Sequence, residues 1–220
     1  RRAAGMGSPL VRTLIASDRA HLPKAPVPKI IETMVKVLRA VRTEAMDAGL
    51  KIAIENHKDL LCWETRQVIE ESGKEFVGSY LDTGNPVFVM EDPLETVETL
   101  APLAVTFHLR DSVVYEVGNG AAVQWVPLGE GVVDFKKIVA RARELMPPNV
   151  YVYIKPITGR PPVTMAYLDR EWMGTWRDLK ASTLARFIAL AKAGHPYDKD
   201  MVIEDLTGRT PPEAYSAALQ

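Results

Sequence analysis

Four apolar segments of the sequence each end on an ionisable residue. They read IAIENH, YLDTGN, TFHLRD and YVYIKP, and they place Glu55, Asp82, His108 and Lys155 at the same relative position. Carboxylate oxygens and an imidazole nitrogen that converge on one point suit Mn²⁺, Mg²⁺, Co²⁺ or Zn²⁺, and three such ligands leave positions open for a substrate. A single acid at a strand end is more often a helix N-cap. Because four segments share the pattern, we predict a common site.

The segments that carry these residues alternate with stretches of helical periodicity. Runs typical of strands cover residues 10–16, 51–55, 76–82, 104–109 and 149–155. An amphipathic helix is predicted over residues 29–49, further helices begin at the N-cap residues Asp92 and Asp134, and another covers residues 175–194. Such alternation is typical of βα units around a parallel sheet, in which the loops after the strands meet at one face.

Composition indicates one soluble globular domain over residues 1–220. The apolar content of 47% can fill a sizeable core, and 27 basic against 28 acidic residues give no field that would attract nucleic acid or an anionic membrane. No apolar run approaches the roughly 18 residues of a membrane span. Cys62 is the single cysteine, which excludes an intrachain disulfide and favours a reducing, cytoplasmic location. The chain begins without Met, so we expect its natural N-terminus, and any signal peptide, to lie outside this sequence.

Five short motifs together resemble the sugar phosphate isomerase/epimerase family, the xylose isomerase-like TIM barrels. They are KIAIENH, VGSYLDTGN, VTFHLRD, PLGEGVVDF and ITGRPP, and the resemblance covers residues 3–160. It implies a (β/α)₈ barrel in which the five predicted strands are the fourth to the eighth, so that about three N-terminal βα units would be absent from this chain.

The resemblance also implies a function and site residues. It assigns Glu55, Asp82 and His108 as ligands of one divalent metal ion. It places His57 and Asn85 toward the substrate, and Arg110 where a basic residue could hold a hydroxyl or an anionic group. The implied activity is isomerisation or epimerisation of a ketose, aldose or related polyol through an enediolate. DNA-repair endonucleases share this barrel, but they need more metal ligands and a more basic surface than this sequence offers.

Lys155 departs from the family pattern, which has a second metal-binding glutamate at this position. An ammonium about 4 Å from a divalent ion repels it by roughly 8 kcal/mol at an effective dielectric constant near 20. Lys155 could therefore replace the metal in an ion cluster with Glu55 and Asp82, giving a sugar-binding or partner subunit. It could instead act as a general base or Schiff-base amine in a lyase or dehydratase. Alternatively the metal stays, the base is Glu55 or a residue on the absent strands, and Lys155 stabilises charge or returns the proton. In the last alternative Lys155 extends to solvent.

Two further segments have a predicted place near the site. Gly129 and Gly131 do not have the spacing of a phosphate-binding loop, so we interpret PLGEGVVDF as a turn that leads to the N-cap at Asp134, with Glu130 able to border the site. Arg160 is predicted to bind substrate, and residues 160–176, which follow the last strand, are predicted to form a lid. Helices are expected in the rest of residues 161–220, and the last of them is predicted to pack on another part of the protein or on a second copy of the chain.

Overall fold

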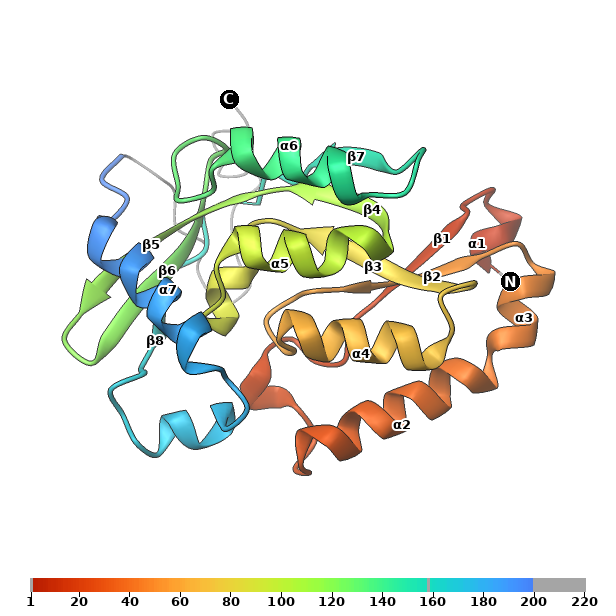
Figure 1. Ribbon diagram of the computed structural model, residues 1–220, viewed down its shortest axis with the longest axis horizontal. Coiled ribbons are helices and arrows are strands. Elements are labelled where there is room, and N and C mark those ends of the chain that lie inside the picture. The colour runs from red at the N-terminus through yellow and green to blue at the C-terminus, as the bar shows by residue number, and fades with distance from the viewer. Residues whose placement is uncertain (1, 158, 200–220) are drawn as a thin grey trace.

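A five-stranded parallel sheet forms the centre of the computed structural model, which describes residues 2–157 and 159–199 (Figure 1). The sheet curls into a half-barrel, as expected for part of a (β/α)₈ barrel. The residues of the three central strands are buried or partly buried, whereas all four residues of the last strand are exposed. In spatial order the strands are β1 (Leu10–Thr13), β2 (Lys51–Glu55), β3 (Val77–Asp82), β4 (Ala104–Leu109) and β7 (Tyr151–Ile154).

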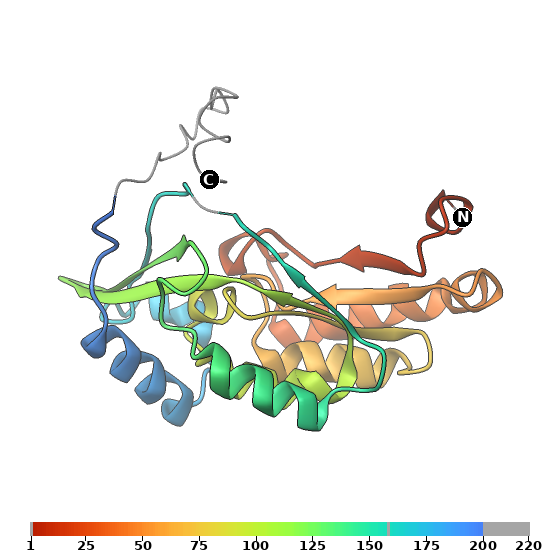
Figure 2. The ribbon, with the colours of Figure 1, turned by 90° about the horizontal axis from the view of Figure 1, so that it is seen from above.

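The long helices that alternate with the strands cover one face of this sheet (Figure 2). The predicted helix over residues 29–49 is divided into α2 and α3 at Val41, whose φ of −101° and ψ of 6° interrupt the regular helix. Ile31, Val35 and Leu38 of α2 pack with Val68 and Ile69 of α4 in one core cluster. The helices are α1 (Arg2–Gly5), α2 (Val27–Ala40), α3 (Arg42–Asp47), α4 (Cys62–Ser72), α5 (Pro93–Leu100), α6 (Phe135–Leu145) and α7 (Ala181–Ala193).

A second, antiparallel sheet lies beyond the carboxyl end of β4, and we did not predict it from the sequence. Its strands are β5 (Asp111–Val117), β6 (Gly120–Val126) and β8 (Val163–Met165), in that order. The strand β8 and the 3-10 helix η4 (Trp172–Trp176) occupy the segment predicted as a lid, and that role stays a prediction. Helix η4 and α7 pack with β5 and β6 in a separate apolar cluster. The predicted C-terminal helix lies outside the described residues.

Three shorter 3-10 helices complete the described part of the chain: η1 (Arg19–His21), η2 (Pro86–Val89) and η3 (Ala101–Leu103). None of the helices within the described ranges is long and apolar enough to cross a membrane.

Glu91, a fully buried acid, caps the N-terminus of α4 from the neighbouring loop. Its two carboxylate oxygens lie 2.8 and 3.1 Å from the backbone nitrogen of Cys62, and one of them also accepts a hydrogen bond from Thr96. Burial raises the pKa of Glu91 to about 7, although these hydrogen bonds favour the charged form. The folded state therefore holds the proton of Glu91 at pH values where the unfolded chain has lost it.

We expect Glu91→Gln to remove one component of the pH dependence of stability. Because the folded-state pKa of Glu91 is raised, the free energy of unfolding falls as the pH rises from about 4.5 to about 7. The variant should lack this slope and be more stable than wild type at pH 8, by up to roughly 3 kcal/mol. Urea unfolding between pH 4.5 and 8 measures it. Glu70→Gln, on the exposed face of α4, is the control, and a slope in Glu91→Gln equal to that of wild type would contradict the prediction.

Candidate active site

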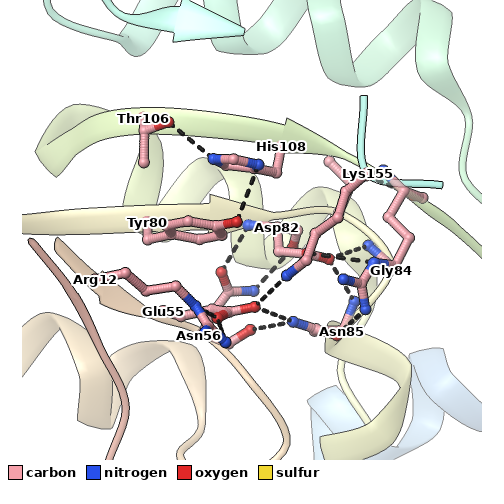
Figure 3. Close-up of polar contacts among 12 residues, drawn as sticks. Arg12, Glu55, Asn56, Tyr80, Asp82, Gly84, Asn85, Thr106, His108 and Lys155 are labelled. Carbon is pink, nitrogen blue, oxygen red and sulfur yellow. Dashed lines mark hydrogen bonds and ion pairs between the residues drawn. The ribbon is translucent and has the colours of Figure 1, made fainter. Parts of the chain in front are cut away.

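The four predicted strand-end residues gather at one edge of the parallel sheet (Figure 3). Glu55 and Asp82 are the last residues of β2 and β3, and Asp82 is in register with His108 on β4. Lys155 follows β7 directly, and its backbone nitrogen still donates to Leu109 on β4. The parallel pairing explains this convergence, because it brings the carboxyl ends of neighbouring strands to the same edge.

The ammonium of Lys155 bridges the two carboxylates. Its Nζ lies 2.8 Å from Oε1 of Glu55 and 3.3 Å from Oδ2 of Asp82. The side chain of Lys155 is 18% exposed, whereas both carboxylates are completely buried. Lys155 does not extend to solvent, and that predicted alternative is wrong. Instead its positive charge lies between two carboxylates that have no access to water.

Two arginines add further positive charge to the same pair of carboxylates. The guanidinium of Arg12, from the end of β1, contacts the second oxygen of Glu55. Nε of Arg110 lies 3.5 Å from Oδ2 of Asp82, in a side chain that is 2% exposed. Burial alone would raise the pKa of Glu55, but Lys155 and Arg12 outweigh it and hold that pKa below its ordinary value. Glu55 is therefore a carboxylate at neutral pH.

Asn56 and Asn85 hold Glu55 and Asp82 in place through hydrogen bonds. The side-chain nitrogen of Asn85 donates to Oε1 of Glu55 at 3.1 Å, and the backbone nitrogens of Gly84 and Asn85 donate to Oδ1 of Asp82 at 3.0 and 3.2 Å. The side chain of Asn56 exchanges two hydrogen bonds with the backbone of Asp82, at 2.8 and 2.9 Å. These contacts hold the acids in one orientation, which a site needs if its charges are to act on a substrate.

His108 reaches the same edge but is engaged elsewhere. Its ring stacks on Tyr80 with centroids 3.9 Å apart, and Tyr80 lies on the strand between His108 and Glu55 (Figure 3). Nδ1 of His108 lies 3.0 Å from the hydroxyl of Tyr80, and Nε2 lies 2.9 Å from the hydroxyl of Thr106. Burial first, and Lys155 second, lower the pKa of His108 to about 4, so the imidazole is neutral at pH 7. Both ring nitrogens thus have protein partners.

A divalent metal ion does not fit this arrangement of donors. The place between Glu55 and Asp82 is taken by the ammonium of Lys155, and the two carboxylates are in contact with three cations, namely Lys155, Arg12 and Arg110. Within residues 2–157 and 159–199, no group of three or more histidine, cysteine, aspartate and glutamate side chains is placed to hold a metal. Of the predicted ligands Glu55, Asp82 and His108, only the two carboxylates meet, around Lys155, because the ring nitrogens of His108 are bonded to Tyr80 and Thr106.

The residues predicted to bind substrate surround this cluster at different depths. Asn85 is buried in it, and Nη1 of Arg110 lies 3.3 Å from the side-chain oxygen of Asn85. His57 is partly buried, and its Nδ1 is enclosed without a hydrogen-bond partner among the described residues. Burial lowers the pKa of His57 to about 4. Arg160 is exposed, and its backbone oxygen accepts a hydrogen bond from Gln124 on β6 at 2.9 Å. Their substrate-binding roles stay predictions.

Sequence reasoning missed Arg12, Tyr80 and Asn56, although one signal was present. Arg12 interrupts an apolar run within the first predicted strand, residues 10–16, where alternation points every second side chain to the same face. Tyr80 stands two residues before Asp82 and so shares its face. A search for residues two positions before each strand-end acid would have found it.

The glycine motif wraps around Asp111, a buried acid that sequence reasoning also missed. The carboxylate of Asp111 accepts hydrogen bonds from the backbone nitrogens of Gly129 and Gly131 at 2.9 Å, and from two further backbone nitrogens, those of Ser112 and Val133. A Cβ on Gly131 would come within 2.2 Å of that carboxylate. The predicted turn and N-cap are confirmed, because the side chain of Asp134 accepts from the backbone nitrogen of Lys137 at the start of α6. Glu130 contacts Lys199.

The sequence of this chain is similar to a known family and to one curated protein. The sequence profile of the xylose isomerase-like TIM barrel family matches residues 1–173. YihM of Escherichia coli strain K12 is 26% identical over 110 residues, which are 50% of this chain and 34% of YihM. The chain therefore spans about a third of the length of that relative.

Solved structures with the same fold include metal-binding, epimerase and dehydratase proteins. The IOLI protein, whose structure contains a zinc atom, is similar with a TM-score of 0.55, at 16% identity over 84% of this chain and 66% of that one. A D-psicose 3-epimerase crystallised with D-fructose gives 0.54, at 19% identity over 85% and 64%. The probable 3-DHS dehydratase AsbF of Bacillus anthracis gives 0.53, at 16% identity over 70% and 59%. With the half-barrel and the family profile together, the chain belongs to the xylose isomerase-like TIM barrel family.

Proposed function

We propose that this chain carries the reacting half of an isomerase or epimerase site for hydroxylated carbonyl compounds, in which the ammonium of Lys155 takes the place of a metal ion. The observation that carries the proposal is the position of Nζ of Lys155 between Glu55 and Asp82. An ammonium at this place is a hydrogen-bond donor aimed at the region where a substrate oxygen would meet the two carboxylates. A sugar or related polyol derivative is the proposed substrate class.

The proposed chemistry uses Lys155 as the electrophile and Glu55 as the base. Lys155 donates a hydrogen bond to the carbonyl oxygen of the substrate, and Glu55 removes the proton from the neighbouring carbon. The electrons of that C–H bond form the new C=C bond, while the carbonyl π electrons move to the oxygen, which gives an enediolate stabilised by Lys155 and Arg12. Return of the proton from Glu55 to the former carbonyl carbon, together with transfer of the neighbouring hydroxyl proton to the former carbonyl oxygen, completes an isomerisation. An epimerisation instead needs a second acid, other than Glu55, that delivers a proton to the opposite face of the first carbon while Glu55 keeps the proton it removed.

The hydrogen bonds in the cluster also explain how Glu55 becomes a base. In the substrate-free site its pKa is low because Lys155 and Arg12 contact it. When Lys155 turns its hydrogen bond to the substrate oxygen, Glu55 loses the nearer of these partners and its affinity for a proton rises. Substrate binding and activation of the base are then one event.

Schiff-base chemistry at Lys155, the basis of a lyase or dehydratase, is the second candidate. The probable 3-DHS dehydratase AsbF shares the fold, but Nζ of Lys155 is held in ion pairs with two buried carboxylates, and a Schiff base on Nζ would break both pairs. Reduction with borohydride in the presence of a keto sugar would trap the adduct on Lys155 if that chemistry occurred. Four further proposals accompany the main one. They are that the chain is a sugar-binding or partner subunit if it is not the enzyme, that it is cytoplasmic, that it forms a homo-oligomer, and that it has no nucleic-acid partner.

Exchange of substrate hydrogen with solvent tests the proposed function without knowledge of the product. Chelator-treated protein is incubated in D₂O with a panel of ketoses and aldoses, and deuterium next to the carbonyl is measured by NMR. We expect incorporation by wild type and a loss of at least about a hundredfold in Lys155→Met, the range of a lost transition-state donor. Exchange that occurs only after Mn²⁺ is added would overturn the metal-free proposal. No exchange under either condition would favour a binding subunit.

A further inference from the structure

Lys58 also lies near the sheet edge that carries the site, but its surroundings differ from those of Lys155. It belongs to the loop that follows β2, shortly after Glu55. Its Nζ lies 5.7 Å from the centre of the Phe88 ring and 5.3 Å from the centre of the Trp125 ring. Whereas the ammonium of Lys155 contacts two carboxylates, Lys58 has no ion-pair partner among the described residues. Lys58 is therefore a lysine against two aromatic rings without a carboxylate in contact.

The electrostatic surroundings of Lys58 favour loss of its proton. Burial lowers the pKa of the ammonium, and the charges of Arg160 and Arg110 lower it further, whereas the carboxylate of Asp18 raises it. Arg110 contacts the same indole ring as Lys58, with its Cζ 4.5 Å from the centre of the Trp125 ring. The faces of aromatic rings attract cations, which limits this lowering but does not reverse it. A larger fraction of Lys58 is therefore the neutral, nucleophilic amine than its ordinary pKa would give.

The position of Lys58 makes its amine available to small molecules close to the site. Lys58 is only partly buried, so a small compound can reach its Nζ. Arg110 connects the two lysines, because its guanidinium contacts Trp125 and its Nε lies 3.5 Å from Oδ2 of Asp82, which Lys155 also contacts. The same region therefore holds one lysine fixed in ion pairs and one lysine that is free of them.

We propose that Lys58 is a nucleophilic amine that forms imines with small hydroxyaldehydes, including sugars in their open-chain form. This activity goes beyond the proton transfer proposed for Lys155 and Glu55 and does not depend on it. The ammonium first lends one proton to water, and the nitrogen lone pair forms a bond to the carbonyl carbon while the carbonyl π electrons move to oxygen. A proton passes from nitrogen to that oxygen, and the lent proton then returns to the new hydroxyl group. This group leaves as water as the nitrogen lone pair forms the C=N bond.

The rings of Phe88 and Trp125 suit the product of this reaction as well as the free lysine. An ammonium and an aldehyde become an iminium and water, so the group at Nζ carries one positive charge before and after the reaction. Ring faces attract an iminium as they attract an ammonium. At Lys155 the same reaction would break two ion pairs with buried carboxylates. The surroundings therefore favour adduct formation at Lys58 over Lys155.

Competitive reductive labelling of the folded protein tests this inference. The protein is incubated at pH 7 with glycolaldehyde and sodium cyanoborohydride, which reduces iminium groups, and peptide mass spectrometry measures the hydroxyethyl group on each lysine. Lys74 is exposed at the opposite end of the strands and is the internal reference, so differences in reagent reactivity cancel. We expect the initial rate at Lys58 to exceed that at Lys74 at least about tenfold. In urea-unfolded protein the ratio of the two rates should be about one.

Asp18→Asn separates the electrostatic cause from simple accessibility. It removes a carboxylate whose charge favours the ammonium of Lys58, while asparagine can still cap the 3-10 helix η1. The ratio of the rates at Lys58 and Lys74 should rise by about two- to fivefold. Asp134→Asn makes the same change in net charge at the exposed N-cap of α6 and is the matched control, in which the ratio should not change.

The outcomes distinguish this inference from the proposed function. A ratio near one in the folded wild type, an adduct on Lys155 instead of Lys58, no adduct at all, or an unchanged ratio in Asp18→Asn would overturn the inference. Lys155→Met, in which the proposed proton transfer should fail, should keep the labelling of Lys58. Labelling of Lys58 and deuterium exchange can therefore succeed or fail separately. Circular dichroism of each variant shows that a changed ratio does not come from a loss of fold.

Discussion

Replacing Lys155 by glutamate is expected to create a divalent metal site where wild type has an ion cluster. The change removes an ammonium that lies 2.8 and 3.3 Å from the two carboxylates and adds a third carboxylate beside them. The repulsion removed is roughly 8 kcal/mol for a charge about 4 Å from a divalent ion. Solvent and the remaining arginines reduce the gain, so we expect Mn²⁺ affinity to rise by at least about a hundredfold, or nearly 3 kcal/mol. Calorimetry and elemental analysis of purified protein measure it.

Lys155→Gln is the matched control for this experiment. It removes the positive charge without adding a carboxylate, so its affinity for Mn²⁺ should fall between those of wild type and Lys155→Glu. About one bound Mn²⁺ per chain in wild type, purified without chelator, would show that Lys155 leaves the carboxylates when metal is present. The metal-free proposal would then be wrong, and Glu55, Asp82 and His108 would again be the expected metal ligands.

Among the single substitutions proposed, loss of the guanidinium of Arg19 is expected to cause the largest fall in the free energy of unfolding. Arg19 and Glu64 form a two-contact ion pair, 2.5 and 3.1 Å long, in which the side chains are 4% and 0% exposed. Arg19 also donates to the backbone oxygens of Asp59 and Thr175 and lies 5.0 Å from the ring of Trp176. Because Arg19→Met leaves the carboxylate of Glu64 buried without its partner, the free energy of unfolding should fall by about 3–5 kcal/mol. Urea unfolding at pH 7 measures it.

Two further variants separate the buried charge from the packing of Arg19. In the double variant with Glu64→Gln, much of the loss should be recovered, because no unpaired charge remains. Arg66→Met breaks an exposed pair with Glu70 on the same helix and should change stability by less than about 0.5 kcal/mol. A double variant as unstable as the two single losses added together would show that Arg19 acts through its contacts with Thr175 and Trp176 instead.

The parallel sheet was predictable because its strands carry strong local signals. Residues 51–55 and 104–109 form strands with the predicted bounds, and the other three predicted strands are present with shorter bounds. The antiparallel sheet was not predicted, since β5 and β6 are largely buried on both faces and do not alternate between apolar and polar residues. The division of the long helix at Val41 was also missed, because the apolar spacing continues through the break.

The site was predictable in its location, and the ion cluster of Lys155 with Glu55 and Asp82 was one of the predicted alternatives, but the partners of His108 and Glu55's contact with Arg12 were not predicted. The strand ends fixed where Glu55, Asp82, His108 and Lys155 would lie. Which of them would face one another depends on side-chain directions that no local pattern encodes. His108 turns to Tyr80 and Thr106, and Arg12 approaches Glu55 from a strand 43 residues earlier in the chain. Such contacts depend on which strands are neighbours in the sheet, and local sequence patterns do not determine that order.

Strands of the two sheets alternate along the chain, and this order has a consequence for unfolding. The chain builds β4 in the parallel sheet, β5 and β6 in the antiparallel sheet, β7 in the first again and β8 in the second. The parallel sheet is complete only with β7, which follows β5 and β6 in the chain, and the antiparallel sheet is complete only with β8, which follows β7. Neither sheet is therefore built from one continuous part of the chain. The two sheets are expected to melt in one cooperative transition, and a protease cut between β6 and β7 would leave two fragments that each hold parts of both.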